Sequence, residues 1–397
     1  MNTRRNPGGE LPLTGIRVID FSQIMMGPAA TQVLGDFGAD VIKVERPGTG
    51  DLFRWALPDP DGLDHPAFCS LNRNKRSIAI DVRSAEGHEI VLALARKADV
   101  IVSNFRPGVM EKLGFGYEAL ADVNPRLIYA CGTGFGASGP YEHKGGQDIL
   151  AQAYAGAISH KADPSLAYSI YPISIADYSA AMHLVQGILL ALIARDRTGH
   201  GQRVDANLYD SMLSTQVMEA AVELARGTEL NWARMPLVGV FPTRDGAVVM
   251  VGAFKENPLR DICAALEIDD LSLDPDLATP EGQEANRDAL QEIFRQRFAE
   301  NKTEHWINRL EAQDVLCAPV RKLREALDDP QTTHNQMLLE IDHPSVGRLR
   351  LLATPVHLSD ARRQDHRPPP TLGQHTDEIL EELGYGHKLS EPAEARS

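Results

Sequence analysis

Cysteine is scarce in this chain, and its spacing excludes two common kinds of site. The 397 residues include four cysteines, and no two of them form a Cys-x-x-Cys pair. No histidine stands beside them at a spacing typical of metal ligands, so the sequence predicts no metal site. The small number and the spacing of the cysteines also disfavour a disulfide framework. So few thiols are typical of the reducing cytoplasm, where we expect the protein to be located.

Long apolar runs and the common nucleotide-binding signatures are also missing. The longest apolar run, residues 184–194, contains Gln186 and is too short to span a bilayer. The N-terminal residues carry two arginines with no apolar stretch after them, unlike a secretory signal. Residues 132–136 (GTGFG) lack the third glycine of a dinucleotide-binding loop, and the chain contains neither a P-loop nor a GxSxG elbow. Membrane proteins, NAD enzymes, P-loop NTPases and serine hydrolases are therefore disfavoured.

The chain has no excess of positive charge. Asp and Glu number 55 against 40 for Lys and Arg, and the formal net charge is −15. Such a charge disfavours general affinity for nucleic acids and anionic membranes. An anionic ligand would need a local cluster of cations. Residues 72–76 (Asn-Arg-Asn-Lys-Arg) form one, and taken alone they are best interpreted as a solvated basic loop.

What the chain does contain is a regular alternation of strand and helix patterns. Helices are expected at 27–37 and at 85–97, where Ser84 can cap the second one. Strands are expected at 16–21, 40–45, 77–82, 99–102 and 127–130. This order indicates βαβ units, hence an α/β, Rossmann-like large domain with a parallel sheet. Ligands of such sheets bind in the loops beyond the carboxyl ends of the strands.

The second half of the chain changes character. A strand at 201–208 and a helix at 209–224 are followed by a hairpin at 241–250 with Asp-Gly at its turn. Helices are expected at 258–266, 281–298 and 303–313. The length also favours two domains. We therefore predict the N-terminal part of the large domain at 1–225, a small α+β domain at 235–323, and a return linker with the rest of the large domain at 324–397.

Two acids stand at expected helix starts. Asp177 begins a long apolar helix, and Asp148 follows a Gly-Gly-Gln turn. A carboxylate at a helix start caps free N–H groups and suits the positive end of the helix dipole. Capping is the simplest interpretation of either residue taken alone.

Several segments together resemble one family. They are residues 13–51 (LTGIRVIDFSQIMMGPAATQVLGDFGADVIKVERPGTGD), 72–87 (NRNKRSIAIDVRSAEG), 99–108 (DVIVSNFRPG), 198–213 (TGHGQRVDANLYDSML) and 372–385 (LGQHTDEILEELGY). In this order, over nearly the whole chain, they resemble the class III CoA-transferases of the CaiB/BaiF type, which include formyl-CoA transferase. The resemblance implies an interlocked, ring-like homodimer. It also implies coenzyme A as substrate and product, with no permanently bound cofactor.

The same resemblance implies a CoA site. It places Arg46 and Lys112 beside phosphates, Ile80 and Arg83 at the adenosine-phosphate pocket, and Asn104 and Phe105 along the pantetheine arm. Lys75, in the basic cluster, is a further candidate. A polyanionic ligand such as CoA needs cations in strand-end loops.

For the reaction, the resemblance implies that Asp177 is the nucleophile and carries CoA as a thioester. Met26 and the backbone N–H groups of residues 23–27 fall where the family stabilises the oxyanion. Gln147 and Asp148 fall beside the nucleophile. For Asp148 three roles remain open: orienting the acceptor acid, tuning Asp177 by like-charge repulsion, or capping a helix.

Two alternatives use the same framework. A 2-methylacyl-CoA racemase would use Asp177 as acid or base together with a histidine in a Gly-His-Asp triplet. Here the triplet is Gly146-Gln147-Asp148, and His143 and His160 lie outside it. Glutamine cannot shuttle a proton, which disfavours a racemase. The other alternative, a non-catalytic CoA-binding homologue, is disfavoured because Asp177 is retained.

The small domain bears on the substrate. Formyl-CoA:oxalate transferases carry a glycine-rich loop that closes over the nucleophile. Between residues 224 and 274 this chain has glycines only at 227, 239, 246 and 252, none of them adjacent. The sequence therefore favours succinyl-CoA or a similar donor, with a carboxylic acid as acceptor.

Overall fold

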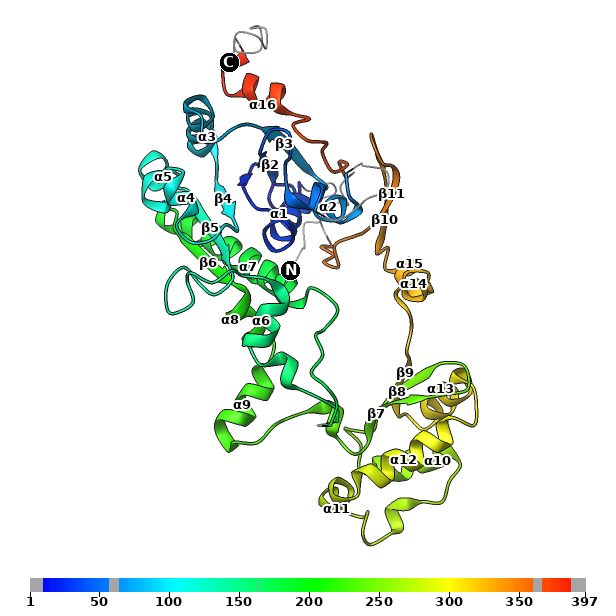
Figure 1. Ribbon diagram of the computed structural model, residues 1–397. Coiled ribbons are helices and arrows are strands. Elements are labelled where there is room, and N and C mark those ends of the chain that lie inside the picture. The colour runs from blue at the N-terminus through cyan, green and yellow to red at the C-terminus, as the bar shows by residue number, and fades with distance from the viewer. Residues whose placement is uncertain (1–9, 57–63, 164, 360–365, 387–397) are drawn as a thin grey trace, which may run out of the picture. The chain divides into compact units, whose positions relative to one another are not determined.

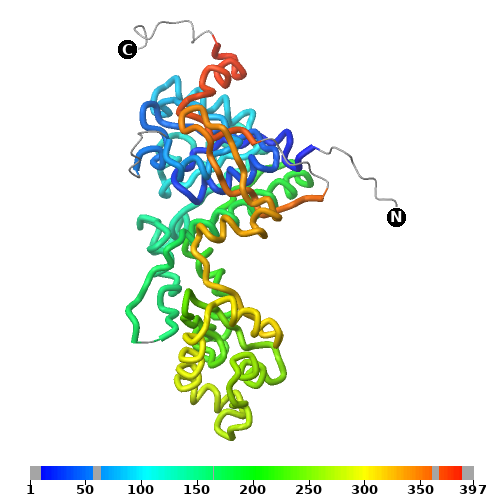
Figure 2. The backbone as a smooth tube through the Cα atoms, turned by 90° about the vertical axis from the view of Figure 1, so that its right-hand side faces the viewer, coloured from blue at the N-terminus to red at the C-terminus, as the bar shows by residue number. Residues whose placement is uncertain are grey.

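The computed structural model describes residues 10–56, 64–163, 165–359 and 366–386, which divide into two compact units. The larger unit comprises residues 1–157, 170–216 and 333–397, and the smaller one comprises 158–169 and 217–332. The predicted small domain, 235–323, lies inside the smaller unit. Residues 333–359 and 366–386, orange to red in Figure 2, return to the N-terminal part of the chain.

The larger unit is built on a six-stranded parallel sheet with the order β3-β2-β1-β4-β5-β6 (Figure 1). Its strands are β1 (Arg17–Asp20), β2 (Asp40–Glu45), β3 (Lys75–Ala79), β4 (Val100–Ser103), β5 (Ile128–Thr133) and β6 (Arg203–Asn207). All five neighbouring pairs are parallel. This is the doubly wound, Rossmann-like order, which confirms the predicted α/β class with a parallel sheet.

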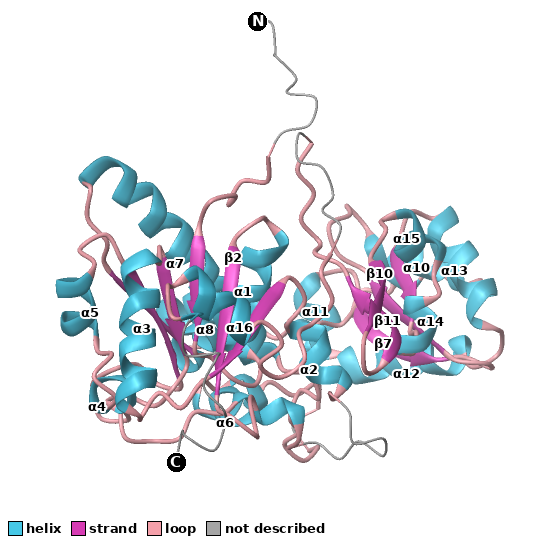
Figure 3. Ribbon diagram, turned by 90° about the horizontal axis from the view of Figure 1, so that it is seen from above, coloured by secondary structure: helices cyan, strands magenta, loops and turns pink. Residues whose placement is uncertain are grey.

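Strand residues alternate between two cores, because successive side chains point to opposite faces of a sheet. Val18 and Val100 contribute to one core, and Ile19 and Ile101 to the other. Helices α1 (Met26–Asp36) and α7 (Ile175–Thr198) pack into the first core. Helices α3 (Ala85–Lys97), α5 (Tyr117–Val123) and α16 (Thr376–Glu382) pack into the second core. Helices thus cover both faces of the sheet (Figure 3).

Helix α7 is longer than its most apolar stretch suggested. It has 24 residues, and an 18-residue stretch within it has a mean hydropathy of 1.4, so by length and composition it could cross a bilayer, contrary to the expectation from residues 184–194. In the structure, however, its face bearing Ala180, Leu184 and Ile188 is fully buried in the first core. Helix α7 is therefore a central core helix, and its first turn carries Asp177.

Short elements complete the larger unit. They are α2 (Pro66–Leu71), α4 (Val109–Lys112), α6 (Asp148–Tyr154), α8 (Leu208–Ser214), η1 (Leu52–Arg54), and a hairpin of β10 (Leu338–His343) and β11 (Gly347–Leu352). This hairpin lies in residues 324–397, for which we predicted a return linker and the rest of the large domain but no hairpin. It buries Ile341 and Leu351 against Phe68.

The smaller unit is an α+β structure, and its hairpin confirms the prediction for residues 241–250. Strands β7 (Val238–Pro242), β8 (Ala247–Val251) and β9 (Leu316–Pro319) form an antiparallel sheet. Its main helices are α9 (Val217–Arg226), α10 (Pro258–Leu266), α11 (Pro280–Ala285), α12 (Arg287–Phe298), α13 (Thr303–Ala312) and α14 (Leu323–Leu327). Helix α15 (Pro330–His334) links the two units along the chain.

Two predicted helices are each divided in the structure. The helix expected at 281–298 is broken at Asn286, which ends α11 and precedes α12. The helix expected at 209–224 is broken between α8 and α9. There the Gln216 amide donates to the carbonyls of Met212 and Ala155, and so satisfies a carbonyl at the end of α8.

Candidate active site

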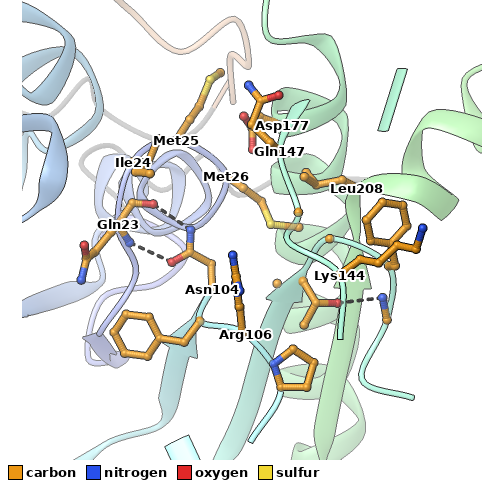
Figure 4. A pocket seen from close by; sticks show the side chains of 18 of the residues that line it. Gln23, Ile24, Met25, Met26, Asn104, Arg106, Lys144, Gln147, Asp177 and Leu208 are labelled. Carbon is orange, nitrogen blue, oxygen red and sulfur yellow. Dashed lines mark hydrogen bonds between the residues drawn. The ribbon is translucent and has the colours of Figure 1, made fainter. Parts of the chain in front are cut away.

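A cavity of about 410 Å³ opens at the carboxyl edge of the parallel sheet. Its walls come from the loops that follow β1, β4 and β5, from the start of α6, and from the first turn of α7. Asp177, Gln147, Met26, Asn104 and Phe105, all predicted site residues, line this one cavity (Figure 4). The structure therefore brings the proposed nucleophile and the proposed pantetheine contacts together.

Asp177 is the third residue of α7 and is half-buried. Among the described residues, none donates a hydrogen bond to its carboxylate, which lies beside Gln147 (Figure 4). Burial, followed by the nearby charge of Asp148, raises the pKa of Asp177 to about 6. The group is thus a carboxylate at neutral pH, and a more basic one than an exposed aspartate.

Asp148 is buried, and both of its oxygens are engaged. Oδ2 accepts the backbone N–H of Asp177 at 2.9 Å, and Oδ1 accepts the Gln152 amide at 2.6 Å. Its own helix, α6, is capped instead by Gln147, whose Oε1 accepts the N–H of Ile149 at 3.0 Å. Asp148 therefore binds the start of α7 and raises the pKa of Asp177. Its burial argues against direct contact with an acceptor acid.

The start of α1 forms the opposite wall. Met26 is its first residue, and the preceding Met25 provides no side-chain cap for the free N–H groups of the first turn. Of the five residues predicted to supply oxyanion donors, Gln23 and Ile24 have their N–H groups occupied by Asn104 and Asp51. The N–H groups of Met25, Met26 and Gly27 remain as candidates. Gly132 makes room for Met26, since a Cβ there would lie 2.5 Å from the methionine sulfur.

Two glycines explain the GTGFG segment without a dinucleotide. A Cβ on Gly134 would lie 2.3 Å from the Cα of Gly146, and a Cβ on Gly146 would lie 2.4 Å from the Cα of Gly134. The loop after β5 and the turn before α6 therefore touch backbone to backbone. This contact closes one wall of the cavity.

The predicted phosphate contacts are exposed cations at the same edge of the sheet. Arg46 follows β2, Arg83 follows β3, and Lys112 ends α4. In the described part of the chain, none of the three has an ion-pair partner. Ile80, predicted at the adenosine-phosphate pocket, is buried. None of these four lines the cavity itself.

The structure contradicts the interpretation of residues 72–76 as a solvated loop. Arg73, Lys75 and Arg76 are buried, and each pairs with an aspartate. The Lys75 ammonium lies 3.0 Å from Asp20 Oδ2, and burial lowers its pKa to about 8. Lys75 is thus an internal ion-pair partner without access to a phosphate, so its assignment as a CoA contact is withdrawn.

Sequence reasoning missed two cations that do line the cavity, Arg106 and Lys144. Arg106 directly follows Phe105, so the strand-end position could have indicated it. Lys144 lies over the rings of Tyr141 and Tyr154, and only the folded chain brings these aromatics together. Both residues add positive charge to a site that would receive an anion.

No other reactive centre is evident in the described residues. No group of three or more histidine, cysteine, aspartate or glutamate side chains there is placed to hold a metal ion. Burial raises the pKa of the Cys69 and Cys131 thiols to about 12 each. These thiols are therefore protonated at neutral pH.

Comparison with known proteins identifies the family. Residues 13–376 match the model of CoA-transferase family III. The chain belongs to this family. It is therefore a CoA-transferase, with coenzyme A as a substrate.

Curated relatives of this CoA-transferase have more than one named activity. An acyl-CoA transferase of Fusarium pseudograminearum is 37% identical, with 94% of this chain and 85% of the relative covered. The succinyl-CoA:glutarate CoA-transferase of Mus musculus is 35% identical, with 94% and 86% covered. A formyl-CoA:oxalate CoA-transferase of Rhodopseudomonas palustris (strain TIE-1) is 34% identical, with 94% of both chains covered.

Solved structures share the fold of this transferase. A CaiB/BaiF family protein from Brucella suis superposes with a TM-score of 0.84 at 33% identity, covering 94% of this chain and all of that one. The M. tuberculosis protein Rv3272 superposes with a TM-score of 0.83 at 31% identity and the same coverage.

Proposed function

We propose that this enzyme transfers CoA from succinyl-CoA or a similar acyl-CoA to a carboxylic acid through a thioester on Asp177. The observation that carries the proposal is the carboxylate itself. It faces the cavity, no described group hydrogen-bonds to it, and its pKa is raised to about 6. A carboxylate suits this exchange because its anhydride and thioester are close in energy to the activated forms of the substrates.

The reaction proceeds by four acyl exchanges. The Asp177 carboxylate attacks the donor thioester carbonyl, forming a mixed anhydride and releasing CoA thiolate. The thiolate attacks the aspartyl carbonyl of the anhydride, which gives aspartyl-CoA thioester and frees the donor acid. The acceptor carboxylate then attacks this thioester, releasing the thiolate again. The thiolate finally attacks the acceptor carbonyl of the new anhydride, giving the product acyl-CoA and free Asp177.

Each attack places negative charge on a carbonyl oxygen. The start of α1 offers backbone N–H groups without a side-chain cap on the wall opposite Asp177. The positive end of a helix and its free donors stabilise such charge, and donors fixed in place are effective because they need no reorganisation. We assign the oxyanion site to this helix start, with Met26 at its first position.

The phosphates of CoA would lie along the edge of the sheet beyond the cavity. Arg46, Arg83 and Lys112 supply exposed cations there, while the net charge of the chain is −15. The pantetheine arm would then run past Phe105 to the nucleophile. Local cations thus overcome a global charge that repels the ligand.

The choice of acid rests on the glycine content of the smaller unit rather than on sequence identity. Relatives named for glutarate and for oxalate are 35% and 34% identical, so identity does not separate them. The smaller unit lacks adjacent glycines between residues 224 and 274, which argues against the oxalate activity. We therefore favour a dicarboxylic donor such as succinyl-CoA. Formate or oxalate as the best partner in a panel of donors and acceptors would overturn this choice.

A homodimer is part of the proposal. Helix α9 has no buried residue, and it exposes Val217, Met218 and Leu224 by 68%, 52% and 88%. In the larger unit, α7 exposes Leu190 by 66%. A second copy of the chain is the occupant that an interlocked dimer would provide for such apolar surfaces. Sedimentation should give the mass of a dimer, and a monomer would contradict this part.

Covalent trapping tests the central proposal. Acyl-CoA is added without acceptor, and hydroxylamine or borohydride then cleaves the adduct. We expect Asp177 to be modified, as shown by mass spectrometry of the peptide that contains it. A racemase would leave Asp177 unmodified and would introduce solvent deuterium at the α-carbon of the acyl group.

The cytoplasmic location remains a prediction that cell fractionation can test.

A further inference from the structure

The loop between β1 and α1 is held in an unusual way. Every backbone N–H and carbonyl group from the Ser22 N–H to the Ile24 N–H forms a hydrogen bond with a side chain. The Ser22 N–H donates to Asp20 at 2.9 Å, and the Ser22 carbonyl accepts Lys43 Nζ at 2.7 Å. The Gln23 N–H donates to Asn104 Oδ1 at 2.9 Å, and the Gln23 carbonyl accepts Asn104 Nδ2 at 2.7 Å (Figure 4). The Ile24 N–H donates to Asp51 Oδ1 at 3.1 Å.

These side chains are themselves fixed from several parts of the sheet. Asp20 ends β1, Lys43 lies in β2, and Asn104 directly follows β4, so three adjacent strands hold one loop. Asp51 is buried and pairs through Oδ2 with Lys43 at 2.8 Å. Its own N–H donates to Glu45 at 3.0 Å. The loop is therefore bound to a rigid frame.

The conformation that the frame enforces is strained. Ile24 has φ of +68°, in the left-handed region. A β-branched residue is a rare occupant of this region because its Cβ lies too close to the following carbonyl oxygen. Its side chain is 39% exposed, so packing around that side chain does not account for the conformation. Such strain persists where surrounding contacts over-determine the backbone.

We propose that Asn104 and Asp51 are positioning residues that hold the 22–24 loop so that the start of α1 meets the reacting carbonyl. The inference rests on the proposed function, because it assigns the loop to the oxyanion site of that reaction. The loop leads directly into Met25 and Met26, which line the cavity with Asp177. Freed from the clamp, Ile24 relaxes to a negative φ and the first N–H groups of α1 move.

The role given to Asn104 differs from a pantetheine contact. Its amide oxygen and nitrogen are both engaged by the backbone of Gln23. Loss of a binding contact raises KM, whereas misplaced oxyanion donors lower kcat. A displacement of about 1 Å in such a group can cost about 100-fold in rate.

The test uses variants of Asn104 and Ile24 in the full-length protein. For Asn104→Ala we expect kcat to fall by about 10- to 100-fold. The KM for acyl-CoA should stay within about threefold of wild type, because the CoA phosphates bind elsewhere. Adding Ile24→Gly should restore part of the lost rate, since glycine adopts a positive φ without strain. Adding Ile24→Val instead is the matched control, because valine keeps the β-branch and should restore nothing.

Three outcomes would overturn the proposal. One is a raised KM with unchanged kcat in the Asn104→Ala variant. Another is equal rescue by glycine and valine. The third is an unchanged rate of adduct formation on Asp177 in the variant. Absence of any adduct in the wild type would instead reject the covalent mechanism, so the two failures are distinguishable. Asp51→Asn is a second probe, because it keeps an acceptor for the Ile24 N–H although it removes the charge that pairs with Lys43.

Discussion

Ionic groups at the cavity wall and those buried elsewhere in the larger unit are held in opposite ways. Among the buried groups, Lys75, Arg73 and Arg76 are each paired with an aspartate, and Asp148 has both oxygens hydrogen-bonded. At the wall and the adjoining edge, Asp177, Arg46, Arg83 and Lys112 have no such partner in the described part of the chain. Paired charges stabilise the architecture, and unpaired charges remain available to a ligand. Changes in the two regions should therefore affect different measurements.

The largest effect on activity is expected at the wall, from Asp177→Asn. Removing the nucleophile should lower kcat by about 10⁴-fold or more. Stability should not fall. The folded protein binds the Asp177 proton more tightly than the unfolded chain, so wild-type stability decreases as pH rises from 3.8 to about 6. Asparagine removes this penalty, and the melting temperature at neutral pH should be equal or higher. Retained activity would refute the nucleophilic role.

The largest effect on stability is expected among the buried ion pairs, from Lys75→Met. It leaves Asp20 buried without its nearest ammonium, which should cost about 3–5 kcal/mol in the free energy of unfolding. Denaturant titration measures this loss. The control is Lys112→Met at the exposed edge, where the change in stability should stay within about 0.5 kcal/mol. Similar losses in both variants would remove the distinction between the two regions.

Asp148→Asn tests the boundary between the regions. The charge of Asp148 contributes to the raised pKa of Asp177, so its removal should lower that pKa. Activity requires the carboxylate and should rise with pH through about 6 in the wild type. In the variant this acidic limb should move to lower pH, with a stability loss of about 1 kcal/mol from the altered hydrogen bonds. An unmoved limb in the pH profile would leave Asp148 with a structural role only.

The smallest effect is expected from reversing one exposed charge. Arg46→Glu should weaken CoA binding by about 5- to 10-fold at low ionic strength, and less at high salt, because exposed charges are screened. Calorimetric titration at two salt concentrations measures the loss of CoA affinity and its dependence on ionic strength. Arg197→Glu, a reversal in the last turn of α7, is the control and should leave CoA affinity unchanged. Equal affinity of the Arg46 variant and wild type would contradict the phosphate assignment.

The strands of the parallel sheet and helices α1, α3 and α7 were largely predictable, whereas α2, α4, α5 and the hairpin of β10 and β11 were not predicted. The patterns predicted β2 and α3 with the bounds that the structure shows, and Ser84 caps α3 through the N–H of Gly87. These elements follow from local periodicity and capping. Strand β3 begins two residues before the predicted position, at Lys75. In a sequence, buried cations look like exposed loop residues as long as their ion-pair partners are unknown. Here the partners are aspartates that lie in other helices and strands.

The site was predictable in outline but not in its contacts. The strand-end loops follow from the α/β pattern, whereas the role of the acid at the start of α7 was implied by the family resemblance. By contrast, Asp148 binds the helix of Asp177 rather than its own, 29 residues along the chain. The clamp on Gln23 spans 81 residues. Such pairings depend on the distances between elements, which periodicity does not contain.

The contact between Gly134 and Gly146 also bears on how this cavity can diversify. Neither glycine has a side chain that a mutation could shorten. Every substitution at either glycine adds a side chain at the point where the two backbones touch. Point mutations therefore cannot change the shape of the cavity gradually at this wall, because any change there must displace a whole loop. New substrate preferences would have to arise on the other walls, where Phe135 and Leu208 present side chains that selection can trim or extend.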